Sequence, residues 1–94
     1  MKRNARTAFN ALKKIGAPVF ETDNHGAHFG ISGESNYEET WADFYEGPML
    51  EKVDEDTGEI LWAFGVNPKI HNILKENDLY CEWWNAGALG VYNR

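Results

Sequence analysis

The sequence has 94 residues, enough for one domain over residues 1–94, and its four Trp, four Tyr and five Phe supply a single hydrophobic core. Its formal net charge is −6, and the single cysteine, Cys81, excludes an internal disulfide and favours a reducing compartment, the cytoplasm. No apolar run approaches the ~20 residues of a membrane-spanning helix or follows the basic start of the chain, so neither a membrane anchor nor a signal peptide is expected.

The first predicted element is a helix over Arg3–Ile15. Apolar residues at helical spacing define one face of this segment, and basic and polar residues cover the other face. Gly16 suits the C-terminal stop, and Pro18 prevents the helix from continuing. The residues predicted to face the core are Ala5, Ala8, Phe9, Leu12 and Ile15.

Two short strands, Ala17–Thr22 and Ala27–Ser32, are predicted next. The residues between them, 23–26, tolerate the positive φ that a hairpin turn requires. Residues 33–40 are polar and predict a loop, after which Trp41–Tyr45 is predicted to be a third strand.

The following segment predicts a hairpin of Met49–Val53 and Glu59–Phe64. Gly58, in the turn between these strands, suits a left-handed backbone position. The run from Ile60 to Val66 is the most apolar in the chain, so a mostly buried strand is expected there.

Asn67 and Pro68 predict the start of a second helix. Asn is a preferred N-cap, and Pro is favoured at the first helical position, where its missing N–H has no partner to lose. Asn77 is expected to take the left-handed position that ends the helix. Ile70, Ile73 and Leu74 are expected to face inward, and Tyr80–Trp84 and Leu89–Asn93 form a predicted closing hairpin.

This order, α-β-β-β-(β-β)-α-β-β, predicts an α+β fold. The expected sheet is antiparallel, with about five to seven strands, and two helices pack on one of its faces. The two ends of the chain also resemble each other, because each is a predicted helix followed by a hairpin. Glu21, Asn24 and Gly30 correspond to Glu82, Asn85 and Gly90 when two one-residue gaps are allowed. Either chance or duplication of an αββ unit accounts for this similarity; duplication would give a pseudo-twofold domain with its helices side by side.

No chemical site stands out in the sequence. The acidic turn at residues 54–59 lacks the ligand spacing of a calcium loop. His25 and His28 have no second ligand pair with the spacing of a zinc site, and Cys81 lies among aromatic residues without an adjacent base. We therefore expect no catalytic, metal-binding or cofactor-binding residues, and a protein that is not an enzyme.

The strongest functional feature is an acidic segment with interleaved aromatic residues. Residues 21–68 contain twelve acidic residues against a single lysine, Lys52. Carboxylates spaced over a rigid surface imitate a phosphate backbone, and Tyr and Trp are frequent binding hot spots. The predicted partner-binding residues of this segment are Glu34, Tyr37, Glu38, Glu39, Trp41, Asp43, Tyr45 and Glu46.

Tyr80, Trp83 and Trp84, on the predicted closing hairpin, form a second candidate surface. Adjacent residues of a strand point to opposite faces, so the side chains of Trp83 and Trp84 cannot both enter the same core layer. One of the two is therefore predicted to be an exposed anchor, either for a partner protein or for a second copy of this chain.

A resemblance adds to this interpretation. Residues 67–74 and 80–87 resemble segments of small phage and prophage proteins, and the size and acidity of the chain are similar to those of anti-CRISPR and anti-restriction inhibitors. The resemblance implies a phage-encoded inhibitor that binds a host protein or ribonucleoprotein complex in the bacterial cytoplasm. It includes no functional motif, so it assigns no residue a role.

Two alternatives remain open. The chain carries five basic residues and no acidic residue between positions 1 and 20, and Lys2, Arg6 and Lys13 are predicted to line one side of the first helix as a nucleic-acid-binding surface. The strongly acidic middle segment opposes that function, so direct nucleic-acid binding is the weaker hypothesis. The other alternative is a self-associating module, a homodimer with Trp83 or Trp84 at its twofold interface.

Overall fold

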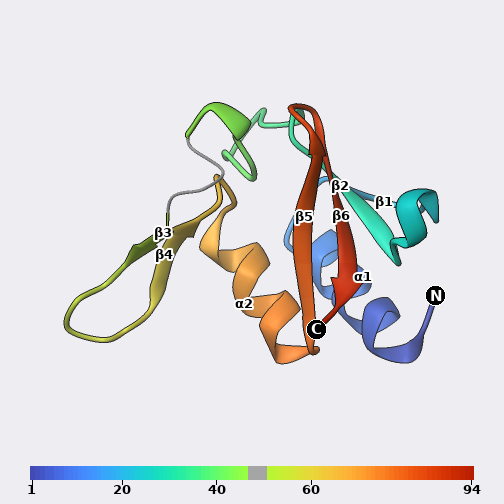
Figure 1. The fold of residues 1–94 in the computed structure, drawn as a ribbon, viewed down its shortest axis with the longest axis horizontal. Coiled ribbons are helices and arrows are strands. Elements are labelled where there is room, and N and C mark those ends of the chain that lie inside the picture. Colours follow the sequence, from blue (N-terminus) through green and yellow to red (C-terminus); the bar gives the residue numbers. More distant parts are fainter. Residues whose placement is uncertain (47–50) are drawn as a thin grey trace.

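The computed structural model of the protein describes residues 1–46 and 51–94. Its two helices and the four strands of the main sheet are arranged in two layers, and a two-stranded ribbon projects to one side (Figure 1). In chain order, the elements are α1 (Arg3–Lys14), β1 (Val19–Phe20), η1 (Asn24–Gly26), β2 (Phe29–Ser32), η2 (Phe44–Glu46), β3 (Glu51–Val53), β4 (Ile60–Ala63), α2 (Pro68–Glu76), β5 (Leu79–Asn85) and β6 (Ala88–Asn93).

The main sheet is antiparallel, with the strand order β1-β2-β6-β5. Alternate residues of its central strands point toward the helices, so one face of the sheet is apolar and lies against both α1 and α2. The large side chains that are fully buried between the sheet and the helices include Leu12, Phe29, Ile31, Ile70, Leu74, Leu79, Leu89 and Val91. The prediction of an α+β fold with two helices on one face of an antiparallel sheet is therefore confirmed.

The predicted size of the sheet is wrong. Four strands form the main sheet, whereas β3 and β4 pair only with each other among the described strands and form a separate two-stranded ribbon. A bulge between Lys52 and Val53 shifts the register of this ribbon. The predicted start of the hairpin at Met49 lies outside the described residues. The local hairpin signal thus identified the pairing, but it contained no information on which sheet the hairpin would join.

Helix α1 begins at the predicted residue and ends one residue early. Ala5, Ala8, Phe9 and Leu12 are buried, as the helical spacing predicts. Ile15 is instead exposed, because it occupies the C-cap position and Gly16, at φ 90°, turns the chain away from the helix axis.

Helix α2 has the predicted N-cap. The Asn67 side chain accepts a hydrogen bond from the backbone N–H of Lys69 at 2.9 Å, and Pro68 occupies the first helical position. The predicted C-terminal position is wrong by one residue, since Asp78 rather than Asn77 takes the left-handed conformation, at φ 57°. Asn77 instead donates its side-chain amide to the carbonyl of Ile73 at 2.8 Å.

The predicted strand at Trp41–Tyr45 is wrong. Only Ala42 makes a β-type contact, an isolated bridge to Val66, and the chain then enters the 3-10 turn η2. Trp41 and Ala42 are both buried although they are consecutive, which a strand with alternating faces does not allow on one side of a sheet. Side chains, rather than a neighbouring strand, satisfy much of the backbone here.

The two ends of the chain have the same order of elements. Each consists of a helix followed by a β-hairpin, α1-β1-β2 and α2-β5-β6, and the second strands of the two units, β2 and β6, pair at the centre of the sheet. In this central pair Gly30 lies directly opposite Gly90, the residue to which the sequence similarity matched it. This is the arrangement that duplication of an αββ unit would produce.

Neither helix in the described part of the chain is long and apolar enough to cross a membrane.

Candidate functional site: an acidic loop with two exposed tyrosines

Residues 33–46, which we call the acidic loop, connect β2 to the projecting ribbon. They include five acidic residues and no lysine or arginine. The loop is anchored near its centre by Trp41, whose side chain is buried in the core beside Ala42. The ammonium group of Lys69 lies 5.7 Å from the centre of the Trp41 ring, so α2 covers the outer side of this anchor.

Asn36 organises the backbone of the first half of the loop. Its side-chain amide donates to the carbonyl of Ala42 at 2.9 Å, and its side-chain oxygen accepts from the N–H of Trp41 at 2.9 Å. These two bonds close residues 36–42 into a compact turn and satisfy backbone groups that the interior would otherwise leave without partners. At the start of the loop, the N–H of Gly33 donates to the carbonyl of Gly87 at 2.8 Å, which fixes the loop to the β5–β6 turn.

Asn67 attaches the centre of the loop to α2. Its backbone N–H donates to the carbonyl of Trp41 at 2.8 Å, and its side-chain amide donates to the carbonyl of Thr40 at 3.0 Å. The same amide lies 3.2 Å from Glu39 Oε1, which also forms a 2.7 Å ion pair with Lys69 Nζ. The hydrogen bond from Lys69, followed by that from Asn67, holds the pKa of the Glu39 carboxyl below its usual value. Glu39 therefore helps to hold the loop against α2.

The second half of the loop is fixed in a similar way. The N–H of Asp43 donates to the carbonyl of Gly65 at 2.7 Å, and its carboxylate accepts from the N–H of Tyr45 at 2.9 Å. The Phe44 ring packs edge-on against Trp83, with 5.4 Å between ring centres. Both halves of the acidic loop thus have defined positions relative to the core.

Two tyrosines project from this fixed backbone. Tyr37 is 91% exposed and Tyr45 is 87% exposed. The carboxylates of Glu34 and Glu38 are also exposed and make no ion pair within the described residues. The loop therefore presents aromatic rings and free carboxylates together on a preorganised surface.

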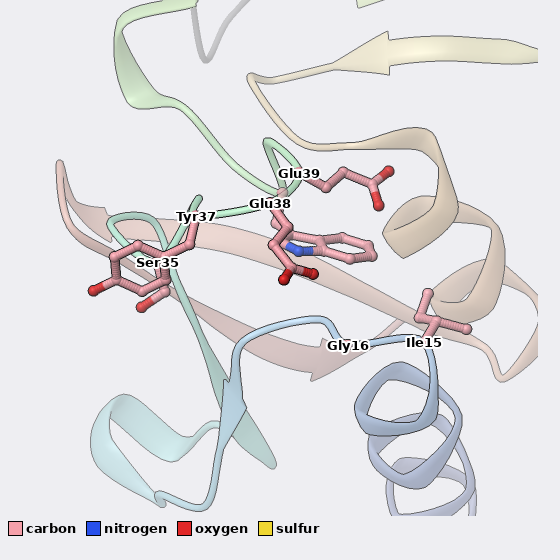
Figure 2. A pocket seen from close by; sticks show the side chains of 7 residues that line it. Ile15, Gly16, Ser35, Tyr37, Glu38 and Glu39 are labelled. Carbon is pink, nitrogen blue, oxygen red and sulfur yellow. The ribbon is translucent and has the colours of Figure 1, made fainter.

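A pocket of about 520 Å³ lies between the acidic loop and the end of α1. Figure 2 shows the Glu38 side chain pointing from the loop toward Gly16, whereas Glu39 points away from it in the direction of α2. Ser35 and Tyr37 border the loop side of this pocket and Ile15 borders the helix side. Ile15, whose exposure the helical spacing did not predict, therefore lines this pocket together with the acidic loop.

The structure divides the predicted partner-binding residues into groups. Glu34, Tyr37, Glu38 and Tyr45 lie on the surface of the acidic loop, while Glu39, Trp41 and Asp43 hold its backbone in place. The Glu46 side chain lies outside the described part of the structure. Trp83 lies beneath the loop, where its indole N–H donates to the carbonyl of Phe64 at 2.6 Å.

Trp84 lies on the opposite face of the sheet from Trp83, as the alternation of side chains along a strand predicts. Both indoles are half-buried, however, so the prediction that one of them is an exposed anchor is wrong. The indole ring of Trp84 covers Gly90, and its N–H donates to the Tyr92 hydroxyl at 2.7 Å. His25 packs against the same ring, with 5.1 Å between centres. Across the sheet the Phe20 ring of β1 covers Gly30 of β2, so this outer face carries aromatic side chains at both edges of the sheet.

Of the outer aromatic face, only Tyr80 and Trp84 were predicted surface residues. Phe20, Tyr80 and Tyr92 belong to different strands, and their common face depends on pairing across the sheet. A signal was present in the two glycines, since Gly30 and Gly90 leave space on this face for large rings.

Metal binding and thiol chemistry are the two remaining candidates from the sequence. Within residues 1–46 and 51–94 no three His, Cys, Asp or Glu side chains come together in a way that suits a metal ion. Burial raises the pKa of the Cys81 thiol to about 12, so its thiolate, the nucleophilic form, is scarce at neutral pH. Comparison with protein-family models, with curated proteins and with solved structures finds no match to this chain.

Proposed function

We propose that this protein is a non-enzymatic binding protein that docks its acidic loop onto a basic, nucleic-acid-binding surface of a host protein or ribonucleoprotein complex. It would act as an inhibitor, like the phage anti-CRISPR and anti-restriction proteins to which it is similar in size and acidity. The observation that carries the proposal is the 91% and 87% exposure of Tyr37 and Tyr45 on a loop whose backbone is fixed by hydrogen bonds.

Exposed tyrosines on a rigid loop are suited to binding for a physical reason. A tyrosine ring contributes a large contact area, and because hydrogen bonds already hold the loop backbone, less entropy is lost on association. The exposed carboxylates of Glu34 and Glu38 attract a basic surface and exclude an acidic one. A target that normally holds a phosphate backbone offers both the positive charge and the stacking surfaces that this loop complements.

The first test of the proposal is affinity capture from bacterial lysate, at low and at moderate salt, with the tagged protein. We expect a discrete protein or ribonucleoprotein complex, and we expect less of it as added salt screens the attraction. Recovery of nucleic acid without protein would contradict the proposal and would favour the basic surface of α1. Capture that does not respond to salt would contradict the role assigned to the carboxylates.

Variants of the acidic loop separate its two contributions. Tyr37→Ser with Tyr45→Ser is expected to weaken binding to the captured complex at least about tenfold, because each buried hot spot contributes more than about 1 kcal/mol. Glu34→Gln with Glu38→Gln is expected to slow association and to reduce the salt dependence. Glu39 and Asp43 are left unchanged, since both support the loop backbone.

The matched control is Glu76→Gln with Glu82→Gln, which removes two exposed carboxylates outside the loop. Surface plasmon resonance with the purified complex measures all of these variants. An equal effect of the control and loop pairs would show that net charge, rather than the acidic loop, governs binding.

A further inference from the structure

A second pocket, of about 290 Å³, lies where α2, the end of β4 and strand β5 meet. Its volume is at the lower limit for sites that enclose a small molecule, so it suits a side chain or a short segment of peptide. The residues that line it include Phe64, Lys75, Tyr80, Cys81 and Arg94.

The pocket lies along the edge of the main sheet. Tyr80 and Cys81 are consecutive in β5 and point to opposite faces: Tyr80 packs with Tyr92 on the outer face, and Cys81 packs against the core. The cavity that both residues line therefore lies beside the backbone of this part of β5. Strand β5 is the terminal strand of its sheet, with β6 as its neighbour among the described strands. An edge of this kind can pair with an additional strand.

Two cations face this edge without a carboxylate partner. Within the described residues the ion pairs are Arg6–Glu21 and Lys69–Glu39, and neither involves Lys75 or Arg94. Arg94 is held in place because its Nε donates to the carbonyl of Leu79 at 3.0 Å. This bond leaves the two terminal nitrogens of the guanidinium without a partner among the described residues, and fixes their direction. A fixed guanidinium is well suited to bind a carboxylate.

Phe64 supplies an apolar wall in an unusual conformation. Its backbone φ is 58°, in the left-handed region that costs a residue with a side chain about 1 kcal/mol or more, and its side chain is 44% exposed. The 2.6 Å hydrogen bond from Trp83 to its carbonyl helps to hold this conformation. The opposite wall is Tyr80, which is 40% exposed.

We propose that this groove binds an extended, acidic peptide segment of a protein partner, which adds as a strand to the edge of β5. A carboxylate of the segment lies between Lys75 and Arg94, and the apolar side chain next to it packs against Phe64 and Tyr80. The site has the opposite charge preference to the acidic loop and does not depend on the function proposed for that loop.

The test is an NMR titration of the ¹⁵N-labelled, N-terminally tagged protein with an acetylated, amidated hexapeptide of alternating glutamate and valine. We expect saturable shifts of the β5 amides, at Tyr80 and Cys81 above all, and of the Arg94 Nε–H. The same peptide with glutamine in place of glutamate is expected to bind about fivefold more weakly, because charge-assisted hydrogen bonds are replaced by neutral ones. The lysine counterpart is expected not to bind.

Two charge-removing variants, Lys75→Gln and Arg94→Gln, are each expected to weaken binding of the glutamate peptide about fivefold. Lys14→Gln removes an exposed lysine at the end of α1 and is expected to leave the affinity unchanged. Spectra of the free variants show whether each remains folded.

Three outcomes would overturn the proposal. The first is the absence of saturable shifts up to about 1 mM peptide, a dissociation constant that corresponds to about −4 kcal/mol of binding free energy. The second is equal affinity for the glutamate and glutamine peptides. The third is tighter binding of a hexathymidylate oligonucleotide at the same amides, which would show that the groove prefers phosphate to an acidic peptide.

Discussion

Cys81 illustrates how the environment of one residue sets its chemistry. It pairs with Val91 across the β5–β6 ladder and packs against the core. Burial stabilises the neutral thiol over the charged thiolate, which is why the pKa rises from 9.0 to about 12. The residue is thus a packing residue whose reactivity is suppressed, as its position among aromatic residues in the sequence predicts.

This raised pKa predicts a loss of stability at alkaline pH. Above about pH 9 the unfolded chain releases the thiol proton while the folded protein retains it. The free energy of unfolding is therefore unaffected by this thiol below about pH 9 and falls as the pH rises from there toward 12. Between about pH 9 and pH 10.5 we expect the wild-type protein to lose about 1.5 kcal/mol more than Cys81→Ala does, measured by urea unfolding.

Comparison with Cys81→Ala removes the contributions of tyrosine and lysine titration, because both proteins share those groups. The variant is also expected to be less stable at neutral pH, since it leaves a small cavity. Parallel stability curves for the two proteins over the alkaline range would show that the thiol is accessible to water.

At the scale of an element, the start of α2 fixes both the helix and the acidic loop. Asn67 caps the helix through Lys69 and holds the loop through Thr40 and Trp41. Its side chain is buried, so each bond lost there leaves a polar group without a partner. The acidic loop and the second helix therefore depend on the same residue.

Asn67→Ala is expected to destabilise the protein by about 2–3 kcal/mol, the sum of a lost N-cap and of a poorly satisfied buried carbonyl. Asn67→Asp is expected to cost less, because a carboxylate still caps the helix, although it lies near Glu39 and cannot donate to Thr40. Thermal and urea unfolding measure both variants.

The control is Asn72→Ala, at an exposed position inside the same helix, which is expected to change the stability by less than about 0.5 kcal/mol. If Asn67→Ala were as mild as this control, the hydrogen bonds at the start of α2 would contribute little to the fold.

At the scale of the whole molecule, the main sheet and the β3–β4 ribbon differ in their support. The strands β2 and β6 lie at the centre of a four-stranded sheet covered by two helices, whereas β3 and β4 form a two-stranded ribbon that projects from the body (Figure 1). A two-stranded hairpin is at best marginally stable without further packing. The ribbon is therefore expected to open independently of the core.

Native-state hydrogen exchange tests this expectation. Amides of β3 and β4 are expected to exchange at least about a hundredfold faster than those of Val91 and Ile31, because local opening of the ribbon costs less free energy than global unfolding. Equal protection of the ribbon and the main sheet would show that the two unfold as one unit. Protection of the ribbon that increases in a captured complex would identify it as part of the interface.

The sequence by itself determined the features that depend on neighbours along the chain. The apolar face of α1 follows from its helical spacing, the start of α2 from Asn67 and Pro68, and the closing hairpin from its turn residues. Helices and tight hairpins are fixed by contacts between residues three to ten positions apart, so local patterns contain the necessary information. The same is true of the charge and aromatic content of the acidic loop.

Tertiary structure alone decided how these parts combine. It turned Trp41–Tyr45 into a side-chain-braced loop, left β3 and β4 outside the main sheet, and placed Trp83 and Trp84 in their separate surroundings. The β5-edge groove likewise brings together Phe64, Lys75 and Arg94 from three separate segments of the chain. Contacts between residues so far apart depend on burial and on sheet pairing across the whole domain, and no local pattern specifies which of the competing pairings buries the most apolar surface.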